Sequence, residues 1–203
     1  MVLKKIMGIF AITLLVGAAS FATAGVPDLT ESDATTAAGS YVMFNIPNGG
    51  GSSFGAAAGG DATITLTLRD GLGAVIANYP FEDMWIESTD GGMVACTGGA
   101  TADANTDAAG ETEWATPLQA GGSSEAGTQV SISGAFLAGA TLPINHNSAD
   151  IDGNGAVNLS DVPLFAGDFY GGMDPFRSDF AFDGFVNLSD VVRLAQALGA
   201  SCP

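Results

Sequence analysis

Between residues 25 and 142, apolar and polar positions alternate in short runs that glycine-rich turns separate. The clearest run covers residues 62–68, where Ile64, Leu66 and Leu68 alternate with threonines and would form one apolar face of a strand. Comparable runs predict about seven strands, at 41–46, 62–68, 74–79, 84–87, 94–96, 112–115 and 129–133. Short strands at this spacing predict a mainly β fold, with a β-sandwich domain over residues 25–142.

After residue 149 the apolar spacing becomes helical. Val162, Phe165 and Phe169 recur at intervals of three and four residues, which predicts a helix over about 160–169. A second helix is expected over about 189–198, with Gly199 at its C-terminal end. We therefore expect a small helical module over residues 150–203, joined to the β domain by a linker at 143–149.

Each predicted helix follows a twelve-residue loop, and the loops at 150–161 and 179–190 share seven identical positions. A hard dication such as calcium binds six to eight oxygens, and a tightly coiled loop presents alternate side chains to such an ion. The expected donors are Asp150, Asp152, Asn154, the Ala156 carbonyl, Asn158 and Asp161 in the first loop, and Asp179, Asp183, the Phe185 carbonyl, Asn187 and Asp190 in the second. An ordinary Asp/Asn/Gly turn is the alternative, but the duplication favours two calcium sites.

The two calcium sites should differ in strength. Position 3 of the loop is Asp152 in the first copy and Ala181 in the second, so the second site lacks one charged oxygen. Position 6 is glycine in both copies, where the backbone must turn sharply. We expect the second loop to bind calcium more weakly.

The motif D-x-D-x-N-G-x-V-N-x-x-D, followed in each copy by a short helix, resembles the paired F-hand repeats of dockerin type I domains over about the last 55 residues. In this family, loop positions 10 and 11 contact a partner cohesin. The resemblance assigns that role to Leu159, Ser160, Leu188 and Ser189, and the repeated Leu-Ser pair implies binding in either of two orientations. Considered by residue type alone, the two leucines could equally pack in the small core.

The β domain is similar to bacterial Ig-like domains of the invasin and intimin type. The residues that carry this similarity are 65–78, a strand, turn and strand, and 106–112, a turn that leads into a strand. The similarity implies an Ig-like β-sandwich.

The N-terminal residues 1–24 have the pattern of a secretory signal, with Lys4 and Lys5 before an apolar run and Ala22-Thr-Ala24 before the expected cleavage point. An uncleaved anchor is the alternative. We expect a secreted or cell-surface protein. After cleavage the chain has three arginines, no lysine and 22 acidic residues, so its formal charge is −19. This charge disfavours nucleic acids and anionic membranes as partners.

Two cysteines, Cys96 and Cys202, remain after residue 24. An oxidising compartment would permit a disulfide between them, which would tie the C-terminal tail to the β domain. Free or intermolecular thiols are the alternative.

Catalysis has little support in the sequence. Gly51-Ser-Ser-Phe-Gly55 matches the G-x-S-x-G motif of hydrolases, but no helical pattern follows it. The single histidine, His146, lies in the predicted linker and is expected to be solvated.

We therefore expect a non-catalytic protein that mediates calcium-dependent attachment or assembly at the cell surface or in the extracellular matrix, with a cohesin-like or other extracellular domain as partner. The alternative is a carbohydrate-binding accessory protein of a polysaccharide-degrading system. An exposed row of aromatic residues would favour that alternative, although Tyr79, Phe81, Trp85 and Trp114 are more often core residues.

Overall fold

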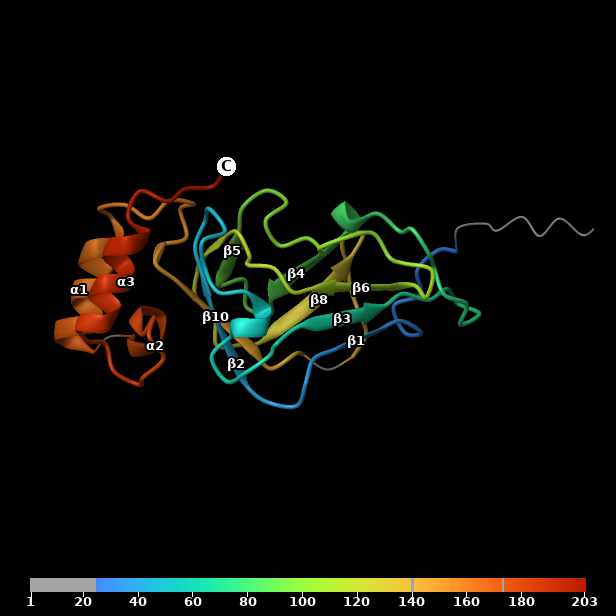
Figure 1. The fold of residues 1–203 in the computed structure, drawn as a ribbon, viewed down its shortest axis with the longest axis horizontal. Helices are drawn as coiled ribbons and strands as arrows, with labels where there is room; N and C mark the ends of the chain where they lie inside the picture. The colour runs from blue at the N-terminus through green and yellow to red at the C-terminus, as the bar shows by residue number, and fades with distance from the viewer. Residues whose placement is uncertain (1–24, 140, 173) are drawn as a thin grey trace, which may run out of the picture.

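The computed structural model describes residues 25–139, 141–172 and 174–203. It is mainly β, with several small sheets and three short α-helices grouped at one end (Figure 1), and two short 3-10 helices lie in the β-rich part, at Phe54–Ala56 and Phe81–Asp83. The expected signal segment, residues 1–24, lies outside the described residues.

The strands are β1 (Asp33–Thr35), β2 (Tyr41–Asn45), β3 (Ile64–Thr67), β4 (Met84–Ser88), β5 (Met93–Ala95), β6 (Glu111–Trp114), β7 (Ala120–Gly122), β8 (Thr128–Ile132), β9 (Ala135–Phe136) and β10 (Ile144–Ser148). The helices are α1 (Asp161–Gly171), α2 (Pro175–Ser178) and α3 (Leu188–Ala197). The strands form four sheets, in the orders β1-β3-β6, β10-β2, β4-β8-β9 and β5-β7. Below, residues 25–148 are called the β-rich region and residues 149–203 the helical region.

The predicted linker at residues 143–149 is wrong, because most of it forms β10. This strand pairs in parallel with β2, and its Ile144 lies opposite Tyr41. Only Ile144 is apolar in β10, so the alternation rule missed the strand. The predicted strand at 74–79 is also wrong: there the chain forms a single bridge, between Arg69 and Val75.

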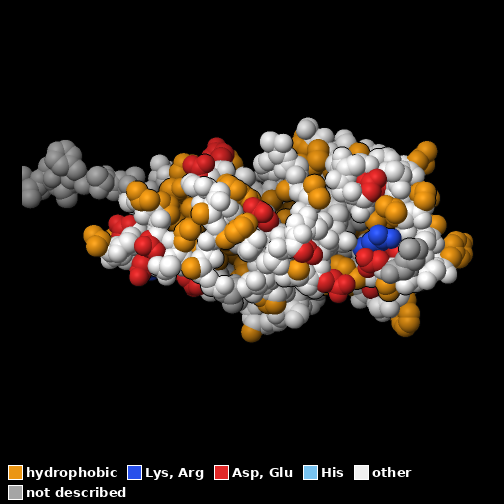
Figure 2. Space-filling model, turned by 180° about the vertical axis from the view of Figure 1, so that it is seen from behind, with side chains coloured by type: hydrophobic (Ala, Val, Ile, Leu, Met, Phe, Trp, Pro, Cys, Tyr) orange, Lys and Arg blue, Asp and Glu red, His pale blue; other side chains and the backbone are white. Residues whose placement is uncertain are grey.

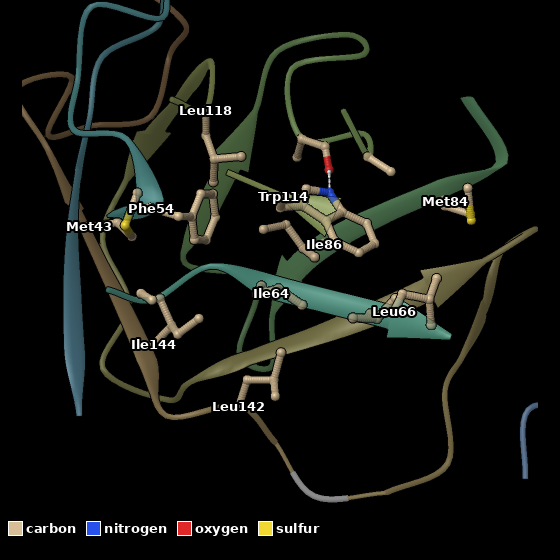
Figure 3. Close-up of a cluster of buried hydrophobic side chains, with 14 of the residues drawn as sticks. Met43, Phe54, Ile64, Leu66, Met84, Ile86, Trp114, Leu118, Leu142 and Ile144 are labelled. Atoms are coloured by element: carbon tan, nitrogen blue, oxygen red, sulfur yellow. Dashed lines mark hydrogen bonds between the residues drawn. The ribbon is translucent and has the colours of Figure 1, made fainter. Parts of the chain in front are cut away.

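The main core lies inside the β-rich region. Trp114 is fully buried, and its indole N–H donates to the Ala100 carbonyl at 3.0 Å (Figure 3). The side chains around it come from strands of different sheets and from the loops between them: Met43, Phe54, Ile64, Leu66, Met84, Ile86, Leu118, Leu142 and Ile144. The predicted apolar face of residues 62–68 is therefore a core face.

A second core joins the two regions. Strand β2 has apolar side chains on both faces. Tyr41 and Met43 enter the main core. Phe44 and Ile46, the latter just after the strand, point to the opposite face and enter the second core. There they pack with residues of the loops and helices: Ala149, Ile151, Val157, Phe165, Phe180, Leu194 and Ala197. The helical region does not rest on a small separate core, because the β-rich region completes it.

Candidate metal centre and the adjoining helical face

Three carboxylates of the first loop converge. Asp150, Asp152 and Asp161 each offer an oxygen, and these oxygens all lie within 4.8 Å of one another. Asp150 and Asp161 are fully buried, whereas Asp152 is exposed. Among the described residues, the first loop is the one place where at least three acidic, histidine or cysteine groups converge in this way.

Backbone amides hold the carboxylates in place. Asp150 accepts hydrogen bonds from the N–H groups of Asn154 and Gly155, at 3.1 and 2.9 Å. Asp161, at the other end of the loop, accepts from the N–H groups of Ile151 and Asn158, at 2.7 and 2.8 Å. The first and last carboxylates of the loop therefore both point into the coil.

The second loop repeats this scheme. Asp179 accepts from the N–H groups of Asp183 and Gly184, at 3.2 and 2.9 Å, and Asp190 accepts from those of Ala181 and Asn187, both at 2.8 Å. The sixth position has a positive φ in both copies, 87° at Gly155 and 85° at Gly184. This is the left-handed region that favours glycine, as the sequence pattern predicted.

Electrostatics in the first loop favour a cation. Burial raises the pKa of Asp150, and the neighbouring charge of Asp161 adds to this rise. The hydroxyl of Ser160 donates to Asp152 at 2.6 Å and lowers the pKa of that carboxyl. The one salt bridge among the described residues joins Arg177 to Asp168, so no arginine neutralises the first loop.

The first loop is packed against the β-rich region. The N–H of Gly122 in β7 donates to the Asp150 carbonyl at 2.7 Å, and a side chain at Gly121 would collide with the Asp150 carboxylate. The tail closes over the other side, since Cys202 N–H donates to the Gly155 carbonyl at 2.8 Å. Cys202 is disulfide-bonded to Cys96, with 5.6 Å between their Cα atoms.

The second loop is also bonded to the β-rich region, through one side chain of β10. The buried side-chain amide of Asn147 in β10 donates to the carbonyls of Phe176 and Asp179, at 3.1 and 2.8 Å. Within the described residues, these are the side-chain hydrogen bonds that link the β-rich region to this part of the chain. The sequence offered no signal for this role, because Asn147 lay in the predicted linker.

Sequence reasoning also missed α2 and its contacts. Arg177 forms two hydrogen bonds to Asp168 of α1, at 2.8 and 3.0 Å, and the Ser178 hydroxyl donates to the same carboxylate at 2.6 Å. Burial acts to raise the pKa of Asp168, but these hydrogen bonds outweigh it and the pKa is lowered. These hydrogen bonds hold α2 against α1.

The residues assigned to the docking face are exposed. Leu159 and Leu188 have exposed fractions of 81% and 73%, so core packing is not their role. Leu188 borders an apolar depression of about 460 Å³ between α1 and α3, which is lined further by Val162, Phe165, Ala166, Phe169, Tyr170, Val191, Leu194, Ala195 and Leu198. Apolar side chains also project from the helical end on the face that Figure 2 shows. Ser160 bonds to Asp152 and Ser189 to Asn187, so both serines also support the loops.

His146 is not a solvated linker residue. It is fully buried, with Nδ1 3.2 Å from the Asn45 amide nitrogen and Nε2 2.7 Å from the Thr128 hydroxyl. Burial lowers its pKa to about 4. Both ring nitrogens contact residues other than Ser52 and Ser53, so the described geometry pairs neither serine with a histidine base.

Comparisons with known proteins leave the family open. No family model matches the chain, and no curated protein matches it. Among solved structures, the Lin-41 filamin domain is similar to this chain at 13% identity, over 61% of this chain and 97% of that one, with a TM-score of 0.31. A TM-score this low does not establish a common fold. No helix in the described part of the chain is long and apolar enough to cross a membrane.

Proposed function

We propose that this protein is secreted or displayed at the cell surface, binds calcium in its two duplicated loops, and attaches through the adjoining helical face to another extracellular protein. The observation that carries the proposal is the convergence of Asp150, Asp152 and Asp161 in the first loop, together with an exposed leucine at the same position of each loop. In finer terms, we propose an Ig-like β-sandwich that carries a dockerin-like pair of F-hands, without catalytic activity.

The donor chemistry supports calcium at the first loop. All expected ligands are oxygens, which suit a hard cation, whereas sites for zinc or copper use nitrogen and sulfur. The side-chain nitrogen Nδ2 of Asn158 lies 3.4 Å from Asn154 Oδ1 and 3.1 Å from the Ala156 carbonyl oxygen. These two oxygens therefore lie near the same donor group. Two buried carboxylates with no cationic neighbour are costly, and a divalent ion would offset that cost.

The exposed leucines support protein attachment. Each loop has an exposed leucine near its end, and Leu188 also borders the apolar depression. Burial against a partner would remove this apolar area from water. The partner we propose is a cohesin-like domain, because loop positions 10 and 11 match those of the dockerin resemblance. The acidic chain would best suit a partner surface that is apolar at its centre and not acidic at its rim.

Terbium luminescence and calorimetry on the whole chain test the calcium part. Terbium, which replaces calcium at oxygen sites, should bind at two sites, and calcium should displace it. Binding by fewer than one ion per chain at millimolar calcium would refute the proposed loops.

Surface binding to purified cohesin domains, with calcium and with EDTA, tests the attachment part. Leu159→Ala or Leu188→Ala alone should change affinity little if two orientations exist, and the double variant should abolish binding. The serines are kept, because Ser160 contacts Asp152. Leu72→Ala is the matched control, since Leu72 is 95% exposed in the β-rich region. Unchanged binding by the double variant would place the docking face elsewhere.

A further inference from the structure

The β4-β8-β9 sheet carries a row of residues on the face that looks away from the main core. Met84 and Ile86 of β4 are buried in that core, so Trp85 between them faces the other side. Trp85 lies opposite Ser131 of β8, and Ser131 lies opposite Phe136 of β9. Paired residues share a face, and neighbouring strands are about 4.8 Å apart, so Trp85 and Phe136 lie about 10 Å apart on one surface.

The aromatic side chains of this row remain accessible. Phe136 is 49% exposed and Trp85 is half-buried. The indole N–H of Trp85 donates to Glu87 at 2.7 Å, which fixes the orientation of the ring. Fully buried Trp114 is by contrast a core residue, so the two tryptophans have different roles.

A depression of about 510 Å³ continues the row at Trp85. Its lining is mainly apolar and includes Phe81, which is 37% exposed, together with a few polar groups from Glu82, Thr97 and Thr101. Thr101 forms a β-bridge with Trp85, so it extends the row on the side opposite Ser131. Apolar walls with a few placed polar groups are typical of small-molecule sites. The hydroxyl oxygen of Ser131 is also buried without a hydrogen-bond partner among the described residues.

We propose that this face, defined by Phe81, Trp85, Thr101 and Phe136, binds an uncharged saccharide chain. The C–H faces of pyranose rings pack on aromatic rings, and their hydroxyl groups bond to carboxylate and hydroxyl side chains. Two aromatic residues separated by two strand spacings suit alternate sugar rings of an extended chain, because one pyranose unit is about as long as one strand spacing. Glu82 and Glu87 border the face, and the chain has a formal charge of −17, so uronic acid polymers and nucleic acids are disfavoured.

Calorimetry with the full-length disulfide-bonded protein tests the proposal, with cellohexaose, xylohexaose and mannohexaose as neutral probes and polygalacturonate as the anionic one. At least one neutral probe should bind, polygalacturonate should not, and EDTA should leave the affinity unchanged. Trp85→Ala should weaken binding about tenfold or more, and Phe136→Ala should weaken it less. Trp85→Phe keeps an aromatic ring and should retain part of the affinity, with Leu72→Ala as the unchanged control.

Three outcomes would overturn the proposal. The first is no heat or fluorescence response to any neutral probe at millimolar concentration. The second is unchanged affinity in both Trp85→Ala and Phe136→Ala, with circular dichroism showing that both variants are folded. The third is concentration-dependent dimerisation that Trp85→Ala abolishes, which would make the face a contact between two copies of this chain. EDTA removes calcium but should not affect saccharide binding, so the two proposed sites are tested independently. Failure of the saccharide proposal therefore leaves the proposed calcium-dependent attachment intact.

Discussion

The two duplicated loops share the hydrogen bonds from backbone amides to their first and last carboxylates, but their surroundings differ. In each, the first carboxylate accepts from the amides of positions 5 and 6, and the last carboxylate accepts from the amide of position 9. Asp150 of the first loop is nevertheless fully buried against β7, whereas Asp179 of the second is partly exposed. The local sequence therefore sets the coil of each loop, and tertiary packing sets how rigidly that coil is held.

This difference has an energetic consequence. The first loop is enclosed by Gly121, Gly122 and the disulfide-bonded tail, so its carboxylates would bind a cation with little further ordering. The second loop is attached to the β-rich region by the Asn147 hydrogen bonds and by packing of Phe180 on Phe44, and it lacks a carboxylate at position 3. Packing and ligand charge thus both predict that the first proposed calcium site is the stronger one.

Removal of the disulfide should have the largest effect on this arrangement. Its cysteines are 106 residues apart, and in the chain-entropy model a loop of that length contributes about 4–5 kcal/mol. The Cys96→Ser/Cys202→Ser variant should lose that much unfolding free energy in guanidinium titrations and should also weaken the first site through Gly155. The wild type in a reducing agent provides an independent comparison. An unchanged unfolding midpoint in both would contradict this role.

A decrease in pH should destabilise β10, the strand that leads into the first loop. The pKa of His146 is about 4 in the folded protein, below its ordinary value of 6.5. Between these pH values the unfolded chain binds a proton that the folded protein excludes, so stability is full above pH 6.5 and falls as the pH drops to 4. The loss from His146 should be about 3 kcal/mol. His146→Gln should flatten the slope in this window relative to the wild type, and parallel slopes would contradict the assignment.

Gly121→Ala should disturb the first loop from the side of the β-rich region. The new methyl group would collide with the Asp150 carboxylate, at an expected cost of about 2 kcal/mol in stability and a weaker first site. Gly55→Ala is the control, because a side chain at Gly55 would meet open space. Terbium titration should show a loss confined to the first site. Equal losses at both sites would argue against the specific contact.

Deletion of the first carboxylate in each loop tests the asymmetry directly. Asp150→Ala should reduce total calcium affinity more than Asp179→Ala, by on the order of tenfold, because Asp150 belongs to the complete acidic cluster. Calorimetry on both variants measures this difference. Two sites of equal affinity in the wild type would disprove it.

Ala181→Asp should produce the smallest effect, and in the opposite direction. It restores a carboxylate at position 3 of the second loop and should strengthen that site by on the order of threefold. Ala109→Asp adds the same charge in an exposed turn of the β-rich region and should leave calcium affinity unchanged. A gain of equal size in both variants would mean that general charge, not ligand number, sets the affinity.

The sequence by itself determined the features that depend on local pattern. Strand β3, with Ile64 and Leu66, follows from alternation, and α1 and α3 follow from helical spacing, each within a few residues. The glycines at positions 6 of the loops have the left-handed backbone that their spacing predicted. The exposure of Leu159 and Leu188 was left open, because residue type alone does not determine whether a leucine at the start of a helix faces the core or the solvent.

Apart from the expected disulfide, only the tertiary structure decided how the two regions join. The polar residues of β10 resemble a linker, yet parallel pairing with β2 and the contacts of Asn45 and Thr128 bury His146 among hydrogen-bond partners. Phe44 and Ile46 belong to a second core because β2 is covered on both faces, which no pattern within β2 specifies. The row from Trp85 to Phe136 arises only when strands far apart in sequence pair in one register. Long-range contacts of this kind depend on which surfaces remain to be buried after the local elements form, and a local pattern does not contain that information.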